Sequence, residues 1–378
     1  MKFFHLSDLH LGKRLNEFSL IEDQEYILKK ILGAIDEHKP DGIIIAGDIF
    51  DKSIPSAEAV QLFDDFLVSL SNRELKVFII SGNHDSPERI AFGSRLMDKS
   101  GIYLSPVYNG NIEPISLEDE FGEINFYLLP FLKPTNVRRF FPECEIDSYT
   151  DAIKVAVEEM KIDTSHRNVL ITHQFVTGAE RSESEEISVG GSDNVDASVF
   201  EGFDYVALGH IHKAQKCGLD FIRYCGTPLK YSFSEAKDKK SITLIDMKEK
   251  GEISLDFIPL IPKRDMVELK GSYDELTLKS FWENTTFTED YTRIILTDEE
   301  DIPEVLTKLR AIYKNIMRLD YDNLRTRSRN EITGAVGIQK KSPFEHFCDF
   351  YELQNGQPIS EEQSAFMLDI IEKLKEAE

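Results

Sequence analysis

Residues 43–51 of this chain read Ile43-Ile44-Ile45-Ala46-Gly47-Asp48-Ile49-Phe50-Asp51. An apolar run that ends in Gly-Asp predicts a buried strand and then a tight turn, and such a turn directs the Asp48 carboxylate out of the end of a sheet. A single aspartate in this position is common, because it caps or closes a turn. Asp48 becomes a candidate functional residue because similar polar residues stand at the ends of other predicted strands in the same chain.

Four other short apolar runs also end beside residues of the kinds that bind metals. The runs span residues 2–6, 77–80, 169–171 and 206–208, and the polar residues behind them are Asp8 and His10, Asn83 and His84, His173, and His210 and His212. In layered α/β folds, sites gather at the carboxyl ends of strands. Five of the nine histidines lie in these turns, so we expect the turns to converge on one place.

Strand and helix patterns alternate along the first 260 residues. Apolar residues recur at helical spacing in 21–35 and 60–70, and a third helix is predicted at 149–160. Further strands are predicted at 125–129, 221–225 and 241–247. The alternation indicates an α/β layered architecture.

Prolines at 259 and 262 mark a boundary, after which the pattern resets to a smaller unit. Its predicted elements are a helix at 276–282, a strand at 292–297, a helix at 303–313 and a strand at 315–319. We therefore expect four segments: a main domain at 1–262, a small α+β capping domain at 263–322, a basic linker at 323–342 and a helical element at 343–378.

The last two segments differ in charge. The linker carries Arg325, Arg327, Arg329, Lys340 and Lys341 with Glu331 as its only acid, and is either a solvated linker or a contact to DNA phosphates. Residues 343–378 hold nine acids against two lysines and two amphipathic helical patterns. Their apolar faces cover either the protein's own body or, as we favour, a partner; the residues are Phe344, Phe347, Phe350, Tyr351, Phe366, Ile370 and Leu374.

The net charge of −24 argues against a general polyanion-binding surface. Contact with nucleic acid would have to be confined to a patch, or be supplied by metals and a partner. No apolar run reaches the roughly 20 residues that span a bilayer, and Asp8 comes too early for a signal peptide. We expect a cytoplasmic protein without a membrane segment. The polar loop at 178–198 is interpreted either as a solvated surface loop or as a flap near the substrate.

The polar residues of the five turns suit a pair of divalent ions. Two ions about 3.5 to 4 Å apart clamp the attacking and leaving oxygens of a phosphoryl group, and they need a bridging carboxylate with neutral nitrogen and oxygen ligands. The candidate ligands are Asp8, His10, Asp48, Asn83, His173, His210 and His212, with Asp48 as the bridge. Mixed ligands without a thiolate suit manganese, iron or zinc and do not choose between them.

His84 stands directly after a candidate ligand and would border the cluster without entering it. There it would stabilise the phosphate or protonate the departing oxygen. Asp51 could hold the His84 imidazole in the required tautomer through its carboxylate. Each motif alone has a structural interpretation, as a turn or a core histidine, and only their combination indicates a catalytic metal centre.

This ordered set of motifs resembles that of the calcineurin-like metallophosphoesterases, whose fold is a two-sheet sandwich flanked by helices. The resemblance implies one metal at Asp8, His10, Asp48 and His212. It implies a second metal at Asp48, Asn83, His173 and His210. His84 would be catalytic.

Four stretches further resemble the family of SbcD-type nuclease subunits: SDLHLG at 7–12, AGDIFD at 46–51, FDYVALGHIH at 203–212 and RYCGTP at 223–228. This resemblance implies two Mn²⁺ per subunit, with Mg²⁺, Fe²⁺ or Zn²⁺ as alternatives. It implies 3′-to-5′ exonuclease activity on double-stranded DNA and endonuclease activity on single strands and hairpins. Eukaryotic members have histidine in place of Asp51.

The same resemblance implies partners. A homodimer of nuclease subunits would join an SbcC-type coiled-coil ATPase in a heterotetramer, gripped by the C-terminal helices, while the capping domain positions DNA. The candidate DNA contacts are Lys13, Arg14, Arg89, Lys230, Arg325, Arg327 and Arg329. Two alternatives remain: a phosphoesterase for nucleotides or other small phosphoesters, and a non-catalytic adaptor that tethers the C-terminal helices to the ATPase.

Overall fold

The computed structural model describes residues 1–182 and 193–323, together with Phe344, Phe347, Cys348, Tyr351, Ile359, Ser360, Gln363, Ser364, Phe366 and Met367. The chain forms two compact units, Met1–Leu296 with Ile302–Asp320, and Thr297–Asp301 with Tyr321–Glu378. Residues 183–192 of the polar loop at 178–198, nearly all of the basic linker, and Phe350, Ile370 and Leu374 lie outside the described residues.

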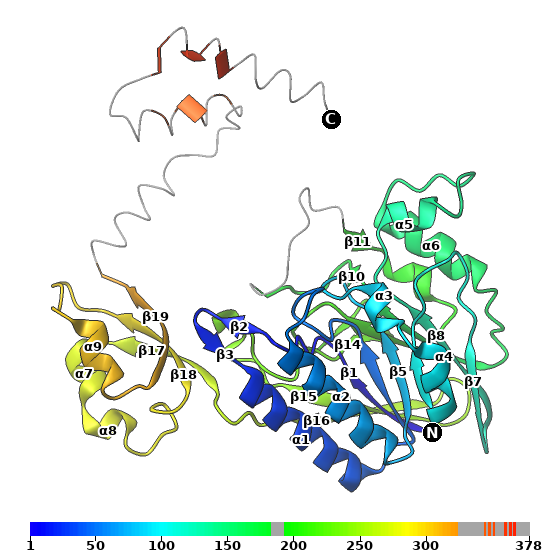
Figure 1. Ribbon diagram of the computed structural model, residues 1–378, viewed down its shortest axis with the longest axis horizontal. Helices are drawn as coiled ribbons and strands as arrows, with labels where there is room; N and C mark the ends of the chain where they lie inside the picture. The colour runs from blue at the N-terminus through cyan, green and yellow to red at the C-terminus, as the bar shows by residue number, and fades with distance from the viewer. Residues whose placement is uncertain are drawn as a thin grey trace. The chain divides into compact units, whose positions relative to one another are not determined.

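Two six-stranded sheets form the main body (Figure 1). The first has the order β16 (Ile253–Pro259), β15 (Ser241–Met247), β1 (Lys2–Leu6), β4 (Gly42–Ala46), β5 (Lys76–Ile80), β6 (Ile102–Leu104). The second has the order β13 (Gln215–Cys217), β14 (Leu219–Tyr224), β12 (Tyr205–Gly209), β9 (Arg167–His173), β8 (Gly122–Leu129), β7 (Ile115–Asp119). All the strands predicted from the sequence in this region are present.

Helices cover the outer face of each sheet, which confirms the predicted two-sheet sandwich. Helices α1 (Ile21–His38) and α2 (Ala57–Ser71) pack on the first sheet, and α6 (Tyr149–Glu159) packs on the second. The shorter helices are α3 (Pro87–Ile90), α4 (Ser94–Met97) and α5 (Pro134–Arg138), with 3₁₀ turns at Asp98–Ser100, Ala197–Phe200 and Phe233–Glu235. Two small strand pairs complete this part: β2 (Arg14–Leu15) with β3 (Phe18–Ser19), and β10 (Phe175–Val176) with β11 (Asn194–Val195).

Strand β4 shows why residues 43–46 are apolar without interruption. Ile43 and Ile45 belong to the core under α1 and α2, whereas Ile44 and Ala46 belong to the core between the two sheets. A strand buried on both faces has no solvent side and therefore no polar alternation.

Residues 263–321, which we call the small unit, follow the main body along the chain. This unit contains β17 (Met266–Gly271), α7 (Tyr273–Thr277), α8 (Lys279–Trp282), β18 (Tyr291–Leu296), α9 (Val305–Arg310) and β19 (Asn315–Tyr321). Its three strands form one sheet in the order β17-β18-β19. The sequence did not predict β17, because only Met266 and Leu269 of its six residues are buried. Arg264 joins this unit to α1 through an ion pair of 2.7 Å with the buried Asp23.

Among the described residues, no helix combines the length and the apolar character that a membrane span requires.

Candidate metal centre

The turns after β1, β4 and β12 hold their polar residues in a strained backbone conformation. Asp8, His10, Asp48 and His210 have positive φ values of 53°, 43°, 49° and 100°. Residues other than glycine rarely adopt this region, and such strain concentrates at functional sites. The first two turns are joined by hydrogen bonds from the Asp8 N–H to the Gly47 carbonyl (3.0 Å) and from the His10 N–H to the Asp48 carbonyl (2.9 Å).

Two glycines let the turns approach one another. A Cβ atom at Gly82 would lie 2.1 Å from Oδ1 of Asp48, and a Cβ at Gly209 would lie 1.9 Å from the carbonyl oxygen of Ala46. No side chain fits at either distance, so the sequence needs glycine at both positions.

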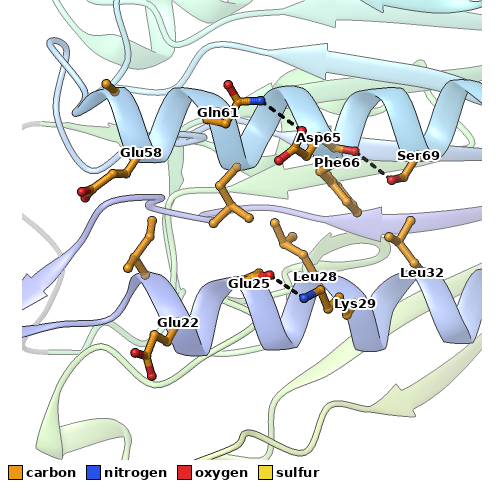
Figure 2. A pocket seen from close by; sticks show the side chains of 13 residues that line it. Glu22, Glu25, Leu28, Lys29, Leu32, Glu58, Gln61, Asp65, Phe66 and Ser69 are labelled. Carbon is orange, nitrogen blue, oxygen red and sulfur yellow. Dashed lines mark hydrogen bonds and ion pairs between the residues drawn. The ribbon is translucent and has the colours of Figure 1, made fainter.

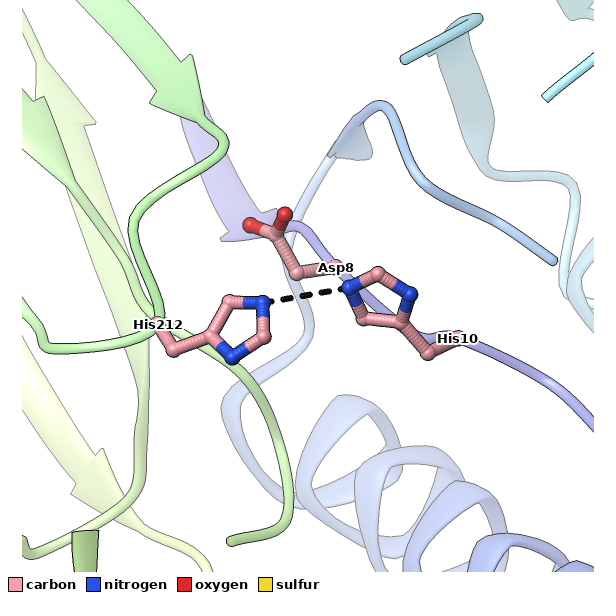
Figure 3. Close-up of side chains that lie close together, drawn as sticks. All are labelled: Asp8, His10 and His212. Carbon is pink, nitrogen blue, oxygen red and sulfur yellow. Dashed lines mark hydrogen bonds between the residues drawn. The ribbon is translucent and has the colours of Figure 1, made fainter. Parts of the chain in front are cut away.

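The first group of polar side chains is Asp8, His10 and His212 (Figure 3). The Nε2 atoms of His10 and His212 lie 3.1 Å apart, and all three side chains are buried. Figure 3 shows the two imidazole rings turned toward one another below the carboxylate. A separation near 3 Å suits two nitrogen ligands that each lie about 2.0 to 2.1 Å from one ion.

The second group is Asp48, Asn83, His173 and His210. Oδ1 of Asn83 lies 3.0 Å from Nε2 of His173 and 3.0 Å from Nδ1 of His210. Nδ1 of His173 lies 2.8 Å from the Ala46 carbonyl, and a proton donated there leaves the Nε2 lone pair facing the cluster.

The Asp48 carboxylate joins the two groups. Its Oδ2 atom lies 3.3 Å from Nε2 of His173 and 3.7 Å from Nε2 of His10. The residues that could hold an ion fall into three overlapping sets: Asp8, His10 and His212; His10, Asp48 and His84; and Asp8, Asp48 and His173. The structure therefore brings together all seven side chains that the sequence singled out as ligands.

The electrostatics of the cluster favour a bound cation. Burial holds the pKa of His10 well below its usual value and lowers the pKa of His210 to about 3, so both imidazoles offer lone pairs. Burial opposes a charge on His173 as well, but the Asp48 and Asp8 carboxylates raise its pKa to about 9. A cation between the carboxylates and this imidazole would replace that proton, as metal binding does in proteins.

His84 borders the cluster as predicted, but the Asp51 carboxylate does not orient it. Nδ1 of His84 lies 3.0 Å from the main-chain carbonyl oxygen of Asp51. The Asp51 carboxylate instead accepts a hydrogen bond of 2.7 Å from Nζ of Lys13, and lies 3.8 Å from Nδ1 of His10. Asp51 therefore contacts His84, as expected, but through its main-chain carbonyl and not through its carboxylate.

Two buried carboxylates behind the cluster were not predicted from the sequence. Oε1 of Glu235 lies 3.5 Å from Nδ1 of His212, and its other oxygen lies 2.6 Å from Nζ of Lys240. The Asp85 carboxylate accepts hydrogen bonds from the N–H groups of Ile49 (3.1 Å), Phe50 (3.0 Å) and Gly82 (3.0 Å). Asp85 directly follows the candidate residues Asn83 and His84 in the sequence, which was a signal, whereas Glu235 belongs to no motif.

The basic residues predicted to contact DNA lie in different surroundings. Arg14 and Arg89 are exposed, whereas Lys13 is half-buried beside Asp51. Lys230 is engaged by the Asp265 carboxylate (2.8 Å) and the Ala236 carbonyl (2.6 Å) at the start of the small unit, and is therefore poorly placed for DNA. Arg325, Arg327 and Arg329 lie outside the described residues.

A groove lies away from the metal centre, between α1 and α2 (Figure 2). It has a volume of about 680 Å³, and Figure 2 shows apolar side chains such as Leu28 and Phe66 between the helices with Glu22 and Glu58 near its end. None of the candidate metal ligands lines it, so its size does not mark a catalytic site.

Comparison with known proteins agrees with this geometry. A family model described as calcineurin-like phosphoesterase matches residues 1–214. The chain belongs to the calcineurin-like phosphoesterase family. The matched residues include all the strand-end turns up to His212. A second family model, SbcD_C, described as type 5 capsule protein repressor C-terminal domain, matches residues 262–355.

Curated relatives identify the branch of the family. The chain is 33% identical to the D subunit of nuclease SbcCD from Staphylococcus epidermidis over 372 residues, which are 96% of each chain. It is 33% identical to the D subunit of nuclease SbcCD from Staphylococcus saprophyticus over 371 residues, again 96% of each. A crystal structure of a dimetal phosphatase from Danio rerio aligns with 69% of this chain and 96% of its own at 9% identity and a TM-score of 0.40, too low to support an inference. The phosphoesterase is thus an SbcD-type nuclease subunit, a metal-dependent hydrolase, as the sequence predicted.

Proposed function

We propose that this phosphoesterase hydrolyses phosphodiester bonds of DNA ends and hairpins at the cluster around Asp48, with two divalent ions bound per subunit. The observation that carries the proposal is the position of the Asp48 carboxylate, within 3.3 Å of His173 and 3.7 Å of His10. A carboxylate between two sets of nitrogen ligands suits a bridge between two ions. The name of the relatives, as the D subunit of nuclease SbcCD, supports DNA as the substrate.

The two groups of side chains divide the ligands between the two ions. Asp8, His10 and His212 would hold one ion, Asn83, His173 and His210 the other, and Asp48 both. Bound divalent ions supply positive charge that stabilises the phosphate in the transition state. The nitrogen and oxygen ligands fit manganese, our proposal for the cellular metal, and also fit iron or zinc.

His84 would handle the proton of the leaving oxygen. Nδ1 of His84 donates to the Asp51 carbonyl, so the opposite nitrogen, Nε2, faces the cluster 4.0 Å from Oδ2 of Asp48. When His84 is protonated, Nε2–H can be donated to the oxygen that departs from phosphorus. The fixed ring orientation keeps this donor in one place between turnovers.

The first test is manganese-dependent degradation of end-labelled linear duplex DNA. His84→Gln is the test variant, and His166→Gln is the matched control, because His166 is 37% exposed and pairs with surface acids outside the cluster. We expect the control to cut DNA and His84→Gln to cut at a rate lower by about 10² to 10⁴-fold. Turnover of bis-p-nitrophenyl phosphate with intact DNA, even after addition of an SbcC-type partner, would instead favour the small-phosphoester alternative.

We further propose that residues 343–378 bind the coiled-coil base of an SbcC-type ATPase. Phe366 is 65% exposed, and Ser360 and Gln363 form a capping box, with a hydrogen bond from the Gln363 N–H to the Ser360 hydroxyl (3.2 Å). Deletion of residues 343–378 should leave metal-dependent cleavage intact and abolish binding of the ATPase. Loss of cleavage without loss of partner binding would contradict this assignment.

A homodimer is proposed through an apolar surface on and beside α2, α3 and α4. The exposed fractions of Ile54, Val60, Phe92 and Leu96 are 72%, 47%, 83% and 77%, around a groove of about 420 Å³. Such a patch on a folded protein marks an interaction surface. Phe92→Asp should convert the dimer to a monomer in light scattering, and a dimer that persists would exclude this face.

A further inference from the structure

A cavity of about 530 Å³ lies beside the metal centre. Gly82 and Asn83 form part of its wall, and the rest comes from Asp85, Pro87 and Glu88, from residues 107 and 108, and from residues between 130 and 140 in and around α5. Cavities of this size hold small molecules or parts of larger ones. Gly82, Asn83 and Asp85 belong to the metal centre and its support, whereas the other lining residues have no role in the proposed chemistry.

Aromatic rings form part of the cavity wall. Phe131 is stacked on His210, with ring centroids 6.4 Å apart and an interplanar angle of 21°, so the cavity begins where the metal cluster ends. Phe140 is 38% exposed, and Tyr108 meets its ring edge-on at 5.7 Å. Partly exposed aromatic rings are the surfaces on which the bases of single-stranded nucleic acids stack.

Two exposed cations border the same cavity. Lys133 and Arg139 line it, and the guanidinium of Arg139 lies 5.7 Å from the centroid of the Phe140 ring. The exposed acid of the lining is Glu88, which accepts a hydrogen bond from the Ser86 hydroxyl. In a chain with a net charge of −24, a paired cation and aromatic ring next to the metal centre suits a ligand that is both anionic and aromatic.

We propose that this cavity binds one nucleotide of the DNA strand next to the bond that is cut. The base lies against the Phe140 and Phe131 rings, and its phosphate lies at Arg139 and Lys133. The inference rests on the proposed nuclease function and adds to it a subsite for an unpaired nucleotide. Because a free nucleotide has the same chemistry as one in a strand, the test compares the two.

The test measures binding in EDTA, so that no strand is cut. Fluorescence anisotropy follows a labelled thymidine pentanucleotide and an abasic pentamer on the full-length chain. The test variants are Arg139→Gln and Phe140→Ala. The charge-matched control is Lys154→Gln, on α6, where Lys154 is 62% exposed and pairs with Glu158.

Wild type and control should bind the thymidine strand about tenfold more tightly than the abasic one, and Phe140→Ala should lose this difference. Arg139→Gln should weaken binding of both strands and lower the slope of log K against log salt by about 0.7, as the loss of one phosphate contact does. A merely structural role for Arg139 would not change the salt slope.

Equal binding of both strands by wild type, or variants that bind like the control, would overturn the proposal. Competition with thymidine monophosphate separates the sources: a pentanucleotide that binds more tightly indicates a DNA strand, and equal affinity indicates a free nucleotide in the same cavity. If Phe140→Ala fails to fold, the exposed Arg139→Gln decides. A wild type that cuts no DNA would refute the nuclease function, whereas the EDTA measurements would still decide about the cavity.

Discussion

The main-chain carbonyl of Asp51 lies 3.0 Å from Nδ1 of His84. A main-chain group holds the imidazole that borders the metal centre, so the orientation of His84 depends on the path of the turn after β4 and not on the side chain at position 51. That path is fixed in turn by Asp85, whose carboxylate accepts the N–H groups of Ile49 and Phe50.

Asp51→Asn should therefore have a small effect on catalysis. The substitution removes the charge beside Lys13 but keeps the carbonyl that His84 contacts. We expect kcat on DNA to fall by less than about tenfold, against about 10² to 10⁴-fold for His84→Gln. Steady-state kinetics with saturating manganese checks this, and equal losses in the two variants would mean that the carboxylate acts on His84 after all.

Glu235→Gln should weaken metal binding. Although burial opposes ionisation of Glu235, His212 and Lys240 hold its pKa well below the usual value, so Nδ1 of His212 faces a carboxylate. Loss of such a partner costs about 10 to 100-fold in metal affinity. Calorimetric titration of the metal-free protein with Mn²⁺ measures the change.

The same substitution leaves the buried Lys240 ammonium without its carboxylate, which costs about 3 to 5 kcal/mol of unfolding free energy. The double variant Glu235→Gln/Lys240→Met removes that charge as well. It should recover stability but not metal affinity. Recovery of both would show that Glu235 acts only through folding.

Gly82→Ala should inactivate the enzyme. The added Cβ would lie 2.1 Å from Oδ1 of Asp48, so the proposed bridging carboxylate has to move. A displacement of about 1 Å at a catalytic group costs about a hundredfold in rate. Gly33→Ala is the control, because a Cβ at Gly33 in α1 meets nothing within 4 Å.

The control substitution should raise the unfolding free energy by about 1 kcal/mol, since alanine is the better helix former. Urea unfolding and DNA cleavage are measured on both variants. Full activity in Gly82→Ala would contradict the close approach of the two turns.

The stability of the main domain should depend on pH through His5. Burial, with the charge of Arg223, lowers the pKa of His5 to about 3 in the folded protein, whereas the pKa of His5 in the unfolded chain is about 6.5. Between pH 6.5 and 3 the unfolded state binds the additional proton, so the contribution of His5 to the unfolding free energy is complete above pH 6.5 and falls as pH falls. One such histidine changes the free energy of unfolding by at most about 1.4 kcal/mol per pH unit.

His5→Gln removes this contribution. Urea unfolding at about pH 7, 6, 5 and 4, in EDTA, should give a shallower pH dependence in the variant than in wild type. The other histidines titrate in both chains, so the difference between the two isolates His5. Parallel curves would mean that His5 is not held neutral in the folded state.

The apolar strands and the polar residues at their ends were predictable from the sequence. The run at 43–46 is apolar throughout because it packs on both sides, and Asp48 stands just beyond it. Strand β17 was not predictable in the same way, because most of its side chains reach solvent. Short-range patterns thus recover buried elements better than exposed ones.

The sequence by itself determined which residues gather at the candidate metal centre, because ligand chemistry restricts their types and strand ends restrict their positions. Only the tertiary structure decided how they are supported: that a carbonyl and not a carboxylate faces His84, that Glu235 stands behind His212, and that Lys230 is engaged by Asp265. Such contacts join distant parts of the chain. His84 and Asp51 are 33 residues apart, and 222 residues separate Leu9 from the Tyr231 hydroxyl that bonds to its carbonyl. The first pair depends on the pairing of β4 with β5 in one sheet, and the second on the path of the chain between β14 and β15; no local pattern in the chain records either.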